Sequence, residues 1–170
     1  AQPYATWADL AARVAAVAGG LRSVHGLLPG DRVAIVMRNR PEYLVAKFAA
    51  WHAGLVAVPV NARLHREEIA YILEDSGSKV VLTDDEHADD VAGLVPVVAS
   101  LRAAVVAPGP DWDRLAAAPI RAEEPAPDAP AWLFYTSGTT GRPKGATLTH
   151  RNLLTMSLSY FADNDWIEPT

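Results

Sequence analysis

Apolar residues recur at helical spacing along the first part of the chain. The residues that share this face are Trp7, Leu10, Val14, Val17 and Leu21. Thr6 precedes them as a candidate N-cap, and Asp9 stands where a carboxylate complements the positive end of a helix. The pattern predicts an amphipathic helix over residues 7–21.

Short runs rich in β-branched residues alternate with further helical segments. The predicted strands cover residues 32–37, 55–60, 80–83, 95–98 and 103–106. The predicted helices cover residues 41–52, 67–75 and 84–90; the first two stop at Gly54 and Gly77, and the third is a solvated acidic helix start. Strands separated by helices predict right-handed βαβ units. The fold class is therefore α/β, with a parallel β-sheet flanked by helices.

A change of composition divides the chain. Residues 119–130 are rich in Pro, Ala and Glu and are predicted to be an irregular linker between a βαβ-type part, residues 1–118, and a second part, residues 131–170. This second part reads as a strand over 131–135, a polar loop, an extended segment over 146–149 and a helix over 151–161. The five tryptophans are predicted to lie in the core or at domain contacts.

The polar loop has the composition of a phosphate-binding segment. Glycines let backbone amides approach anionic oxygens, while hydroxyls and an ammonium add further donors. The spacing differs from a Walker loop, because Gly145 stands where that loop has a hydroxyl and Pro143 removes an amide. The candidate phosphate-binding residues are Thr136, Ser137, Gly138, Thr139, Thr140, Gly141 and Lys144.

The segment Tyr-Thr-Ser-Gly-Thr-Thr-Gly-Arg-Pro-Lys-Gly over residues 135–145 resembles the signature loop of the adenylate-forming enzymes. This superfamily contains acyl-CoA synthetases, luciferases and peptide-synthetase adenylation domains. The resemblance extends upstream through residues 28–36, 40–64 and 69–83, so it covers essentially the whole chain. Val60-Asn-Ala-Arg63 and the segment Leu148-Thr-His-Arg-Asn-Leu153 are similar to the acyl- or aryl-CoA ligase branch.

The resemblance implies an AMP-forming ligase that uses ATP and Mg²⁺ to convert a carboxylic acid, fatty or aromatic, into an acyl-adenylate, which coenzyme A then attacks. It implies that the loop binds the β- and γ-phosphates and that Thr136 helps to bind magnesium. The catalytic lysine of the family is expected downstream, so the chain is expected to be an inactive N-terminal fragment that self-associates through exposed apolar surface. His150 is expected either to anchor the loop or line the nucleotide site, or to have a structural role at a helix start, and Arg142 either to touch phosphate or to face water.

Composition narrows the alternatives. A net charge of −5 argues against nucleic acid as a partner, and the lack of cysteine suits a cytoplasmic protein without disulfides. No apolar run is long enough to span a membrane. Two other functions stay open: an adenylation domain that loads a carrier protein, and a non-catalytic α/β nucleotide-binding module.

Overall fold

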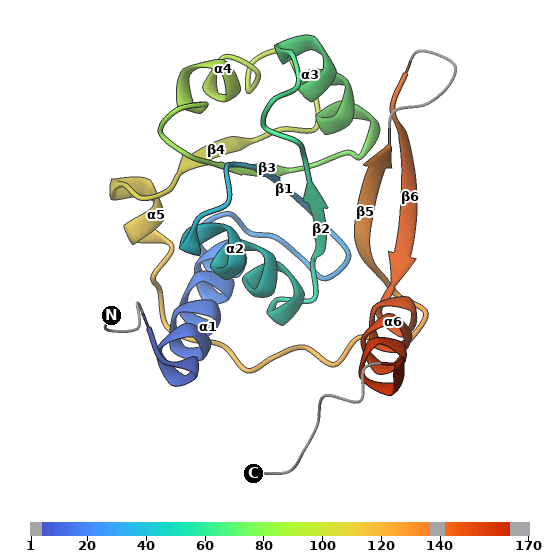
Figure 1. The fold of residues 1–170 in the computed structure, drawn as a ribbon. Coiled ribbons are helices and arrows are strands. Elements are labelled where there is room, and N and C mark those ends of the chain that lie inside the picture. The colour runs from blue at the N-terminus through green and yellow to red at the C-terminus, as the bar shows by residue number, and fades with distance from the viewer. Residues whose placement is uncertain (1–4, 137–141, 164–170) are drawn as a thin grey trace.

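The structure is a computed structural model and describes residues 5–136 and 142–163. Six strands form one sheet with helices on both of its faces (Figure 1). The helices are α1 (Trp7–Ser23), α2 (Pro41–His52), α3 (Arg66–Asp75), α4 (Ala88–Ala92), α5 (Pro110–Arg114) and α6 (His150–Asp163). The strands are β1 (Arg32–Val36), β2 (Val56–Pro59), β3 (Val80–Thr83), β4 (Ala103–Val106), β5 (Pro130–Thr136) and β6 (Lys144–Thr149).

Local signals in the sequence explain where the first helices begin and end. Thr6 and Asp9 form a reciprocal capping box at the start of α1, as predicted. Pro41 occupies the first turn of α2, where its missing N–H costs nothing. After α2 and α3 the chain turns at Gly54 and Gly77, whose φ angles of 71° and 61° favour glycine.

The sheet has the strand order β4-β3-β1-β2-β5-β6. The first five strands in this order run parallel, whereas β6 pairs antiparallel with β5. The α/β class predicted from the sequence is confirmed, and the antiparallel edge strand makes the sheet mixed. The two parts on either side of residues 119–130 share this sheet, because Ala57 of β2 is paired with Trp132 of β5.

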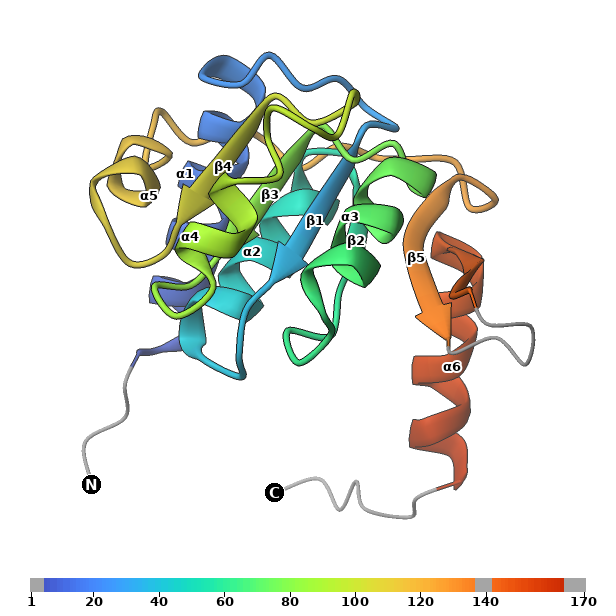
Figure 2. The same cartoon turned by 90° about the horizontal axis from the view of Figure 1, so that it is seen from above.

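Alternate residues of the parallel strands contribute their side chains to two separate cores, one on each face of the sheet. In β1, Val33 and Ile35 pack with α1 and α2, while Ala34 and Val36 pack with α3 and α4. Figures 1 and 2 show the two helical layers on opposite faces of the sheet. Because both faces are covered, β1 and β3 are almost continuously apolar.

Two predicted elements differ from the structure. Residues 95–98 do not form a strand: the N–H groups of Val97 and Val98 donate to the carbonyl of Leu94, which gives helix-like turns. The predicted acidic helix over residues 84–90 is instead a short helix over Ala88–Ala92. Asp84 precedes that helix and is only 1% exposed, so it is not a solvated helix start.

Residues 119–129 form no helix or strand, as predicted, but they are bound to the first part of the chain. The Arg22 guanidinium forms an ion pair of 2.8 Å with Glu123, and the Glu123 N–H donates to the carbonyl of His52. The ring of His52 also contacts the carbonyl of Ile120 at 2.8 Å. The segment is therefore a docked connection that leads the chain from α5 around α1 and α2 to β5.

Candidate functional site

The carboxyl ends of the parallel strands meet at one edge of the sheet. The chain leaves β1 towards α2 on one face, but leaves β2 and β3 towards α3 and α4 on the other. Ligands of open α/β sheets bind where neighbouring connections diverge in this way. A groove of about 1120 Å³ lies here; its walls come from residues 37–39 and 43 after β1, 59–63 after β2, 86–87 after β3, and 134–135 of β5.

The two strands that flank the polar loop bring two candidate residues together. Thr136 ends β5 and is paired directly opposite Lys144, the first residue of β6. Both are exposed, and directly opposed side chains of an antiparallel pair project from the same face. By strand alternation this face also carries Trp132 and Phe134. The hydroxyl and the ammonium thus share the base of the loop, while Ser137, Gly138, Thr139, Thr140 and Gly141 lie outside the described residues.

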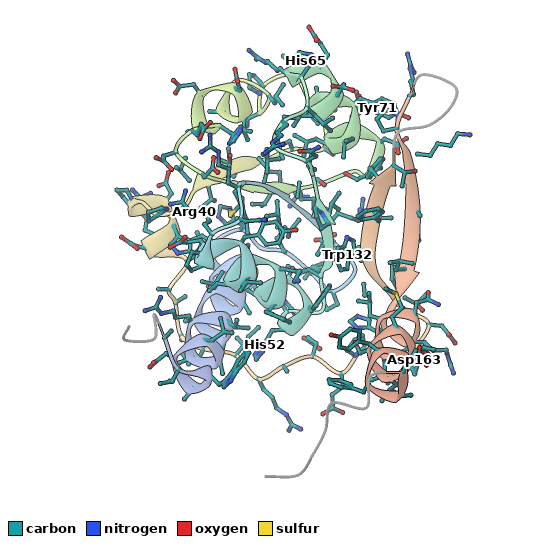
Figure 3. All side chains as sticks on the ribbon, in the orientation of Figure 1. Arg40, His52, His65, Tyr71, Trp132 and Asp163 are labelled. Atoms are coloured by element: carbon teal, nitrogen blue, oxygen red, sulfur yellow. The ribbon has the colours of Figure 1, made fainter. Side chains whose placement is uncertain are left out.

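The opposite face of the β5–β6 hairpin is held by α3. The Tyr135 hydroxyl donates a 2.7 Å hydrogen bond to Oδ2 of Asp75. Partial burial and the adjacent Asp75 carboxylate raise the pKa of Tyr135, so its hydroxyl stays protonated. The guanidinium of Arg142 lies over the ring of Tyr71, 5.5 Å from its centroid. Figure 3 labels Tyr71 on α3 beside the end of the hairpin.

Gly145 has a packing role that its place in the polar segment did not suggest. It is paired with Tyr135, and a Cβ at this position would lie 2.9 Å from the Tyr135 ring. Real side chains essentially never make so short a contact, so glycine allows the ring to lie across β6.

A hydrogen-bond network around the Asp84 carboxylate joins the segments that follow β1 and β3. The backbone N–H of Arg38 donates to Asp84 at 2.8 Å, and Nδ1 of His87 donates to the other carboxylate oxygen. Burial opposes the ionisation of Asp84, but these hydrogen bonds outweigh it and hold its pKa below the usual value. The sequence interpretation missed this network; its available signal was an aspartate placed directly after a buried strand.

The structure places the two residues near the loop whose roles the sequence left open. His150 begins α6 at the other end of β6 from Lys144, and its N–H donates to the carbonyl of Ala129. It therefore lies at a helix start, which is one of the roles expected from the sequence. Arg142 is exposed but stacks on Tyr71.

The tryptophans were predicted to lie in the core or at domain contacts, and the structure can test the first of these alternatives. Trp51 and Trp132 are partly buried, with ring centroids 5.8 Å apart. Trp7 is 86% exposed, so it does not lie in the core and only the domain-contact alternative is left for it; Trp166 lies outside the described residues. Partial burial lowers the pKa of the His150 imidazole, in keeping with its packing at the start of α6.

Among the described residues near the loop, the candidate ligand for magnesium is a hydroxyl. In residues 5–136 and 142–163, no three His, Cys, Asp or Glu side chains gather to form a metal site. Mg²⁺ often keeps water and substrate phosphates as ligands and needs few from the protein. The exposed hydroxyl of Thr136 fits one such ligand. The same ranges contain no helix that could cross a membrane.

Residues 2–169 match the family described as AMP-binding enzyme. The chain belongs to this family. It is 44% identical over 166 residues to a feruloyl-CoA synthase of Amycolatopsis, covering 94% of this chain and 31% of that protein. It is 37% identical over 173 residues to the long-chain-fatty-acid–CoA ligase FadD13 of Mycobacterium tuberculosis, covering 95% of this chain and 32% of the ligase.

A solved structure shows the same architecture. The fold superposes with a TM-score of 0.85 on the inhibitor-bound N-terminal domain of FACL13 from Mycobacterium tuberculosis, at 34% identity, covering 94% of this chain and 41% of that one. The chain therefore spans about a third of the length of the curated relatives and a little more of this domain. The family resemblance predicted from the loop and the upstream segments is confirmed.

Proposed function

We propose that the chain is part of an AMP-forming acyl-CoA ligase. In the first step a carboxylate of the substrate attacks the α-phosphorus of ATP, which forms an acyl-adenylate and releases pyrophosphate. In the second step the thiol of coenzyme A attacks the acyl carbon, which forms the thioester and releases AMP and the thiol proton. The family match and the resemblance to two CoA ligases support this assignment.

The pairing of Thr136 with Lys144 carries the proposal for this chain. Negative charge accumulates on pyrophosphate as it leaves, and an ammonium fixed nearby stabilises that charge more in the transition state than in the ground state. The Thr136 hydroxyl, directly opposite, can donate to a phosphate oxygen or bind Mg²⁺ through its own oxygen. Magnesium supplies further neutralisation of the phosphates when bound.

Ser137, Gly138, Thr139, Thr140 and Gly141 complete the proposed phosphate-binding segment, on the grounds of composition and family resemblance. We assign the nucleotide contacts to residues 131–170 and a supporting role to residues 1–118, with residues 119–130 as their connection.

The acid is proposed to be aromatic or fatty, because the relatives include a feruloyl-CoA synthase and a long-chain-fatty-acid ligase. A cytoplasmic location suits the lack of cysteine.

The test is substrate-dependent exchange of pyrophosphate into ATP by the full-length protein. We expect Lys144→Ala to slow exchange by about a hundredfold, in line with the loss of one oxyanion-type donor, and Lys144→Arg to restore part of it. Thr136→Val should raise the magnesium concentration required. Thr147→Val, an exposed threonine three residues after Lys144 in β6, is the matched control. Unchanged exchange in Lys144→Ala would contradict the proposed role of the loop.

The acceptor is tested separately, by supplying coenzyme A or a phosphopantetheinylated carrier protein to the acyl-adenylate. Thioester formation on coenzyme A supports the ligase, while transfer to the carrier alone supports an adenylation domain. We also propose that the 170-residue chain alone self-associates. The support is α6, where Leu154, Leu158 and Phe161 are 57–62% exposed at helical spacing.

A further inference from the structure

The β5–β6 hairpin joins the sheet through β5, but its end that carries Thr136 and Lys144 extends beyond the end of β2. Its register with β2 rests on Ala57 and Trp132, while Thr136 lies four residues further along β5. An isolated two-stranded ribbon is marginally stable in water. The end of the hairpin that carries Thr136 and Lys144 therefore needs another contact to hold it in place.

Helix α3 provides that contact through two side chains one turn apart. Asp75 accepts the hydrogen bond from Tyr135 on the β5 stem, and Tyr71 supports Arg142, two residues before Lys144 on the other stem. Residues at i and i+4 of a helix share a face, so one face of α3 reaches both stems. Figures 1 and 2 both show α3 beside β5.

The contacts are arranged so that they leave the proposed ligand side open. Tyr135 points to the α3 side of the hairpin, where it packs with the second core. Thr136 follows Tyr135 along β5, Lys144 precedes Gly145, which is paired with Tyr135, and both project from the other face. Gly145 makes room for the Tyr135 ring, so ring, carboxylate and glycine form one fitted unit.

We propose that Tyr135 and Asp75, supported by Tyr71 and Arg142, are positioning residues that fix the Thr136–Lys144 pair for the nucleotide. This inference rests on the proposed function and adds the residues that set ATP affinity from outside the site. A hydroxyl and an ammonium that bind a polyanion must be held in place before binding, because ordering them afterwards lowers the affinity. The charge-assisted bond from Tyr135 to Asp75 supplies most of this order.

The experiment compares steady-state constants of the full-length ligase. Tyr135→Phe and Asp75→Asn should each raise the KM for ATP about tenfold, as expected for one lost charge-assisted hydrogen bond. The KM for the carboxylic acid should not change. The double variant should be no worse than either single one, because both changes break the same contact. Asp75→Glu, which keeps the carboxylate, should recover part of the affinity.

Tyr71→Leu should raise the KM for ATP by a smaller factor, about threefold, since an exposed cation–π contact is weak. Glu74→Gln, the exposed carboxylate beside Asp75 on α3, is the matched control and should leave every constant unchanged. Melting temperatures separate positioning from folding. A KM for ATP that is unchanged in Tyr135→Phe, or effects that multiply in the double variant, would overturn the inference.

Failure of this inference is distinguishable from failure of the proposed function. If Lys144→Ala abolishes exchange but Tyr135→Phe and Asp75→Asn behave as wild type, the phosphate role stands and the positioning role is wrong. If Lys144→Ala is also fully active, the proposed function itself fails.

Discussion

The β1–β4 region and the β5–β6–α6 region of the same chain are built in opposite ways. Strands β1 and β3 are buried on both faces by four helices, and β3 has no exposed residue. By contrast, β6 is mostly exposed, and the described part of α6 has no buried residue. The first region gains its stability from apolar burial. The second region contains the residues proposed to bind ATP and is held by a few specific contacts.

The two regions should differ in the free energy at which they unfold locally. Segments with little buried apolar surface unfold locally at a lower free energy than segments in the core. The Thr136–Lys144 pair stands on such a segment, so its geometry depends on individual contacts with α3. Four experiments, taken from the largest expected effect to the smallest, test whether the two regions differ as described.

A matched pair of leucines measures the difference most directly. Leu82 in β3 is 0% exposed and Leu154 in α6 is 62% exposed. Leu82→Ala should lower the free energy of unfolding by about 3 kcal/mol, through lost burial and a residual cavity. Leu154→Ala should change it by less than about 0.5 kcal/mol. Urea titration of the 170-residue chain checks both values, and equal losses would refute the contrast.

Asp84 tests the polar edge of the β1–β4 region. Its pKa is lower in the folded chain than in the unfolded chain, so its ionised form stabilises the fold above pH ~4. That contribution is lost as the pH falls through the folded pKa. Asp84→Asn should therefore cost about 2 kcal/mol at pH 7, because it disturbs the three hydrogen bonds that the carboxylate accepts, and the cost should shrink in acid.

The measurement is the free energy of unfolding of both proteins between pH 7 and pH 2.5. Asp113→Asn, an exposed aspartate in α5, serves as the control and should be nearly neutral throughout. A difference between Asp84→Asn and wild type that stays constant with pH would show that the carboxylate's ionisation is not what stabilises this edge.

The sequence predicted the features that depend on neighbours along the chain. Thr6 and Asp9 marked the start of α1, Gly54 and Gly77 marked two helix ends, and the apolar runs located β1, β2, β3 and β4. Residues 95–98 were misinterpreted as a strand because Val95 and Val98 can pack against the second core from a turn as well as from a strand. Local periodicity cannot distinguish these cases over four residues.

The contacts that position the candidate site could not be predicted from neighbours along the chain. Tyr135 and Asp75 are 60 residues apart, and their hydrogen bond exists only because α3 crosses beside β5. Asp84 was assigned to solvent because its sequence neighbours are acidic, yet it follows β3 into the sheet edge. The composition of the loop predicted phosphate binding, which stays a prediction, but the opposition of Thr136 to Lys144 required the antiparallel register of β6.

Gly145→Ala tests the fitted contact in the hairpin. The added methyl group would lie 2.9 Å from the Tyr135 ring, so the ring must shift away from β6, which disturbs its hydrogen bond with Asp75. We expect a cost of about 1 kcal/mol in unfolding, at the low end for overpacking because the hairpin is exposed, together with a raised KM for ATP in the full-length protein. Adding Tyr135→Ala should relieve the steric part. If Gly145→Ala has no effect on either quantity, the ring does not depend on this glycine.

The smallest effect concerns the exposed helix α6. Leu158 is 59% exposed, so replacing it with a charged residue removes little from the folded chain itself. Leu158→Glu should leave the free energy of unfolding nearly unchanged and weaken self-association of the 170-residue chain about threefold, the effect of a partly buried leucine at an interface. Sedimentation over a concentration series measures this change. An equal loss of folding stability would mean that α6 packs on the chain itself, whereas a concentration-independent monomer would show that its apolar face has no affinity for a second copy.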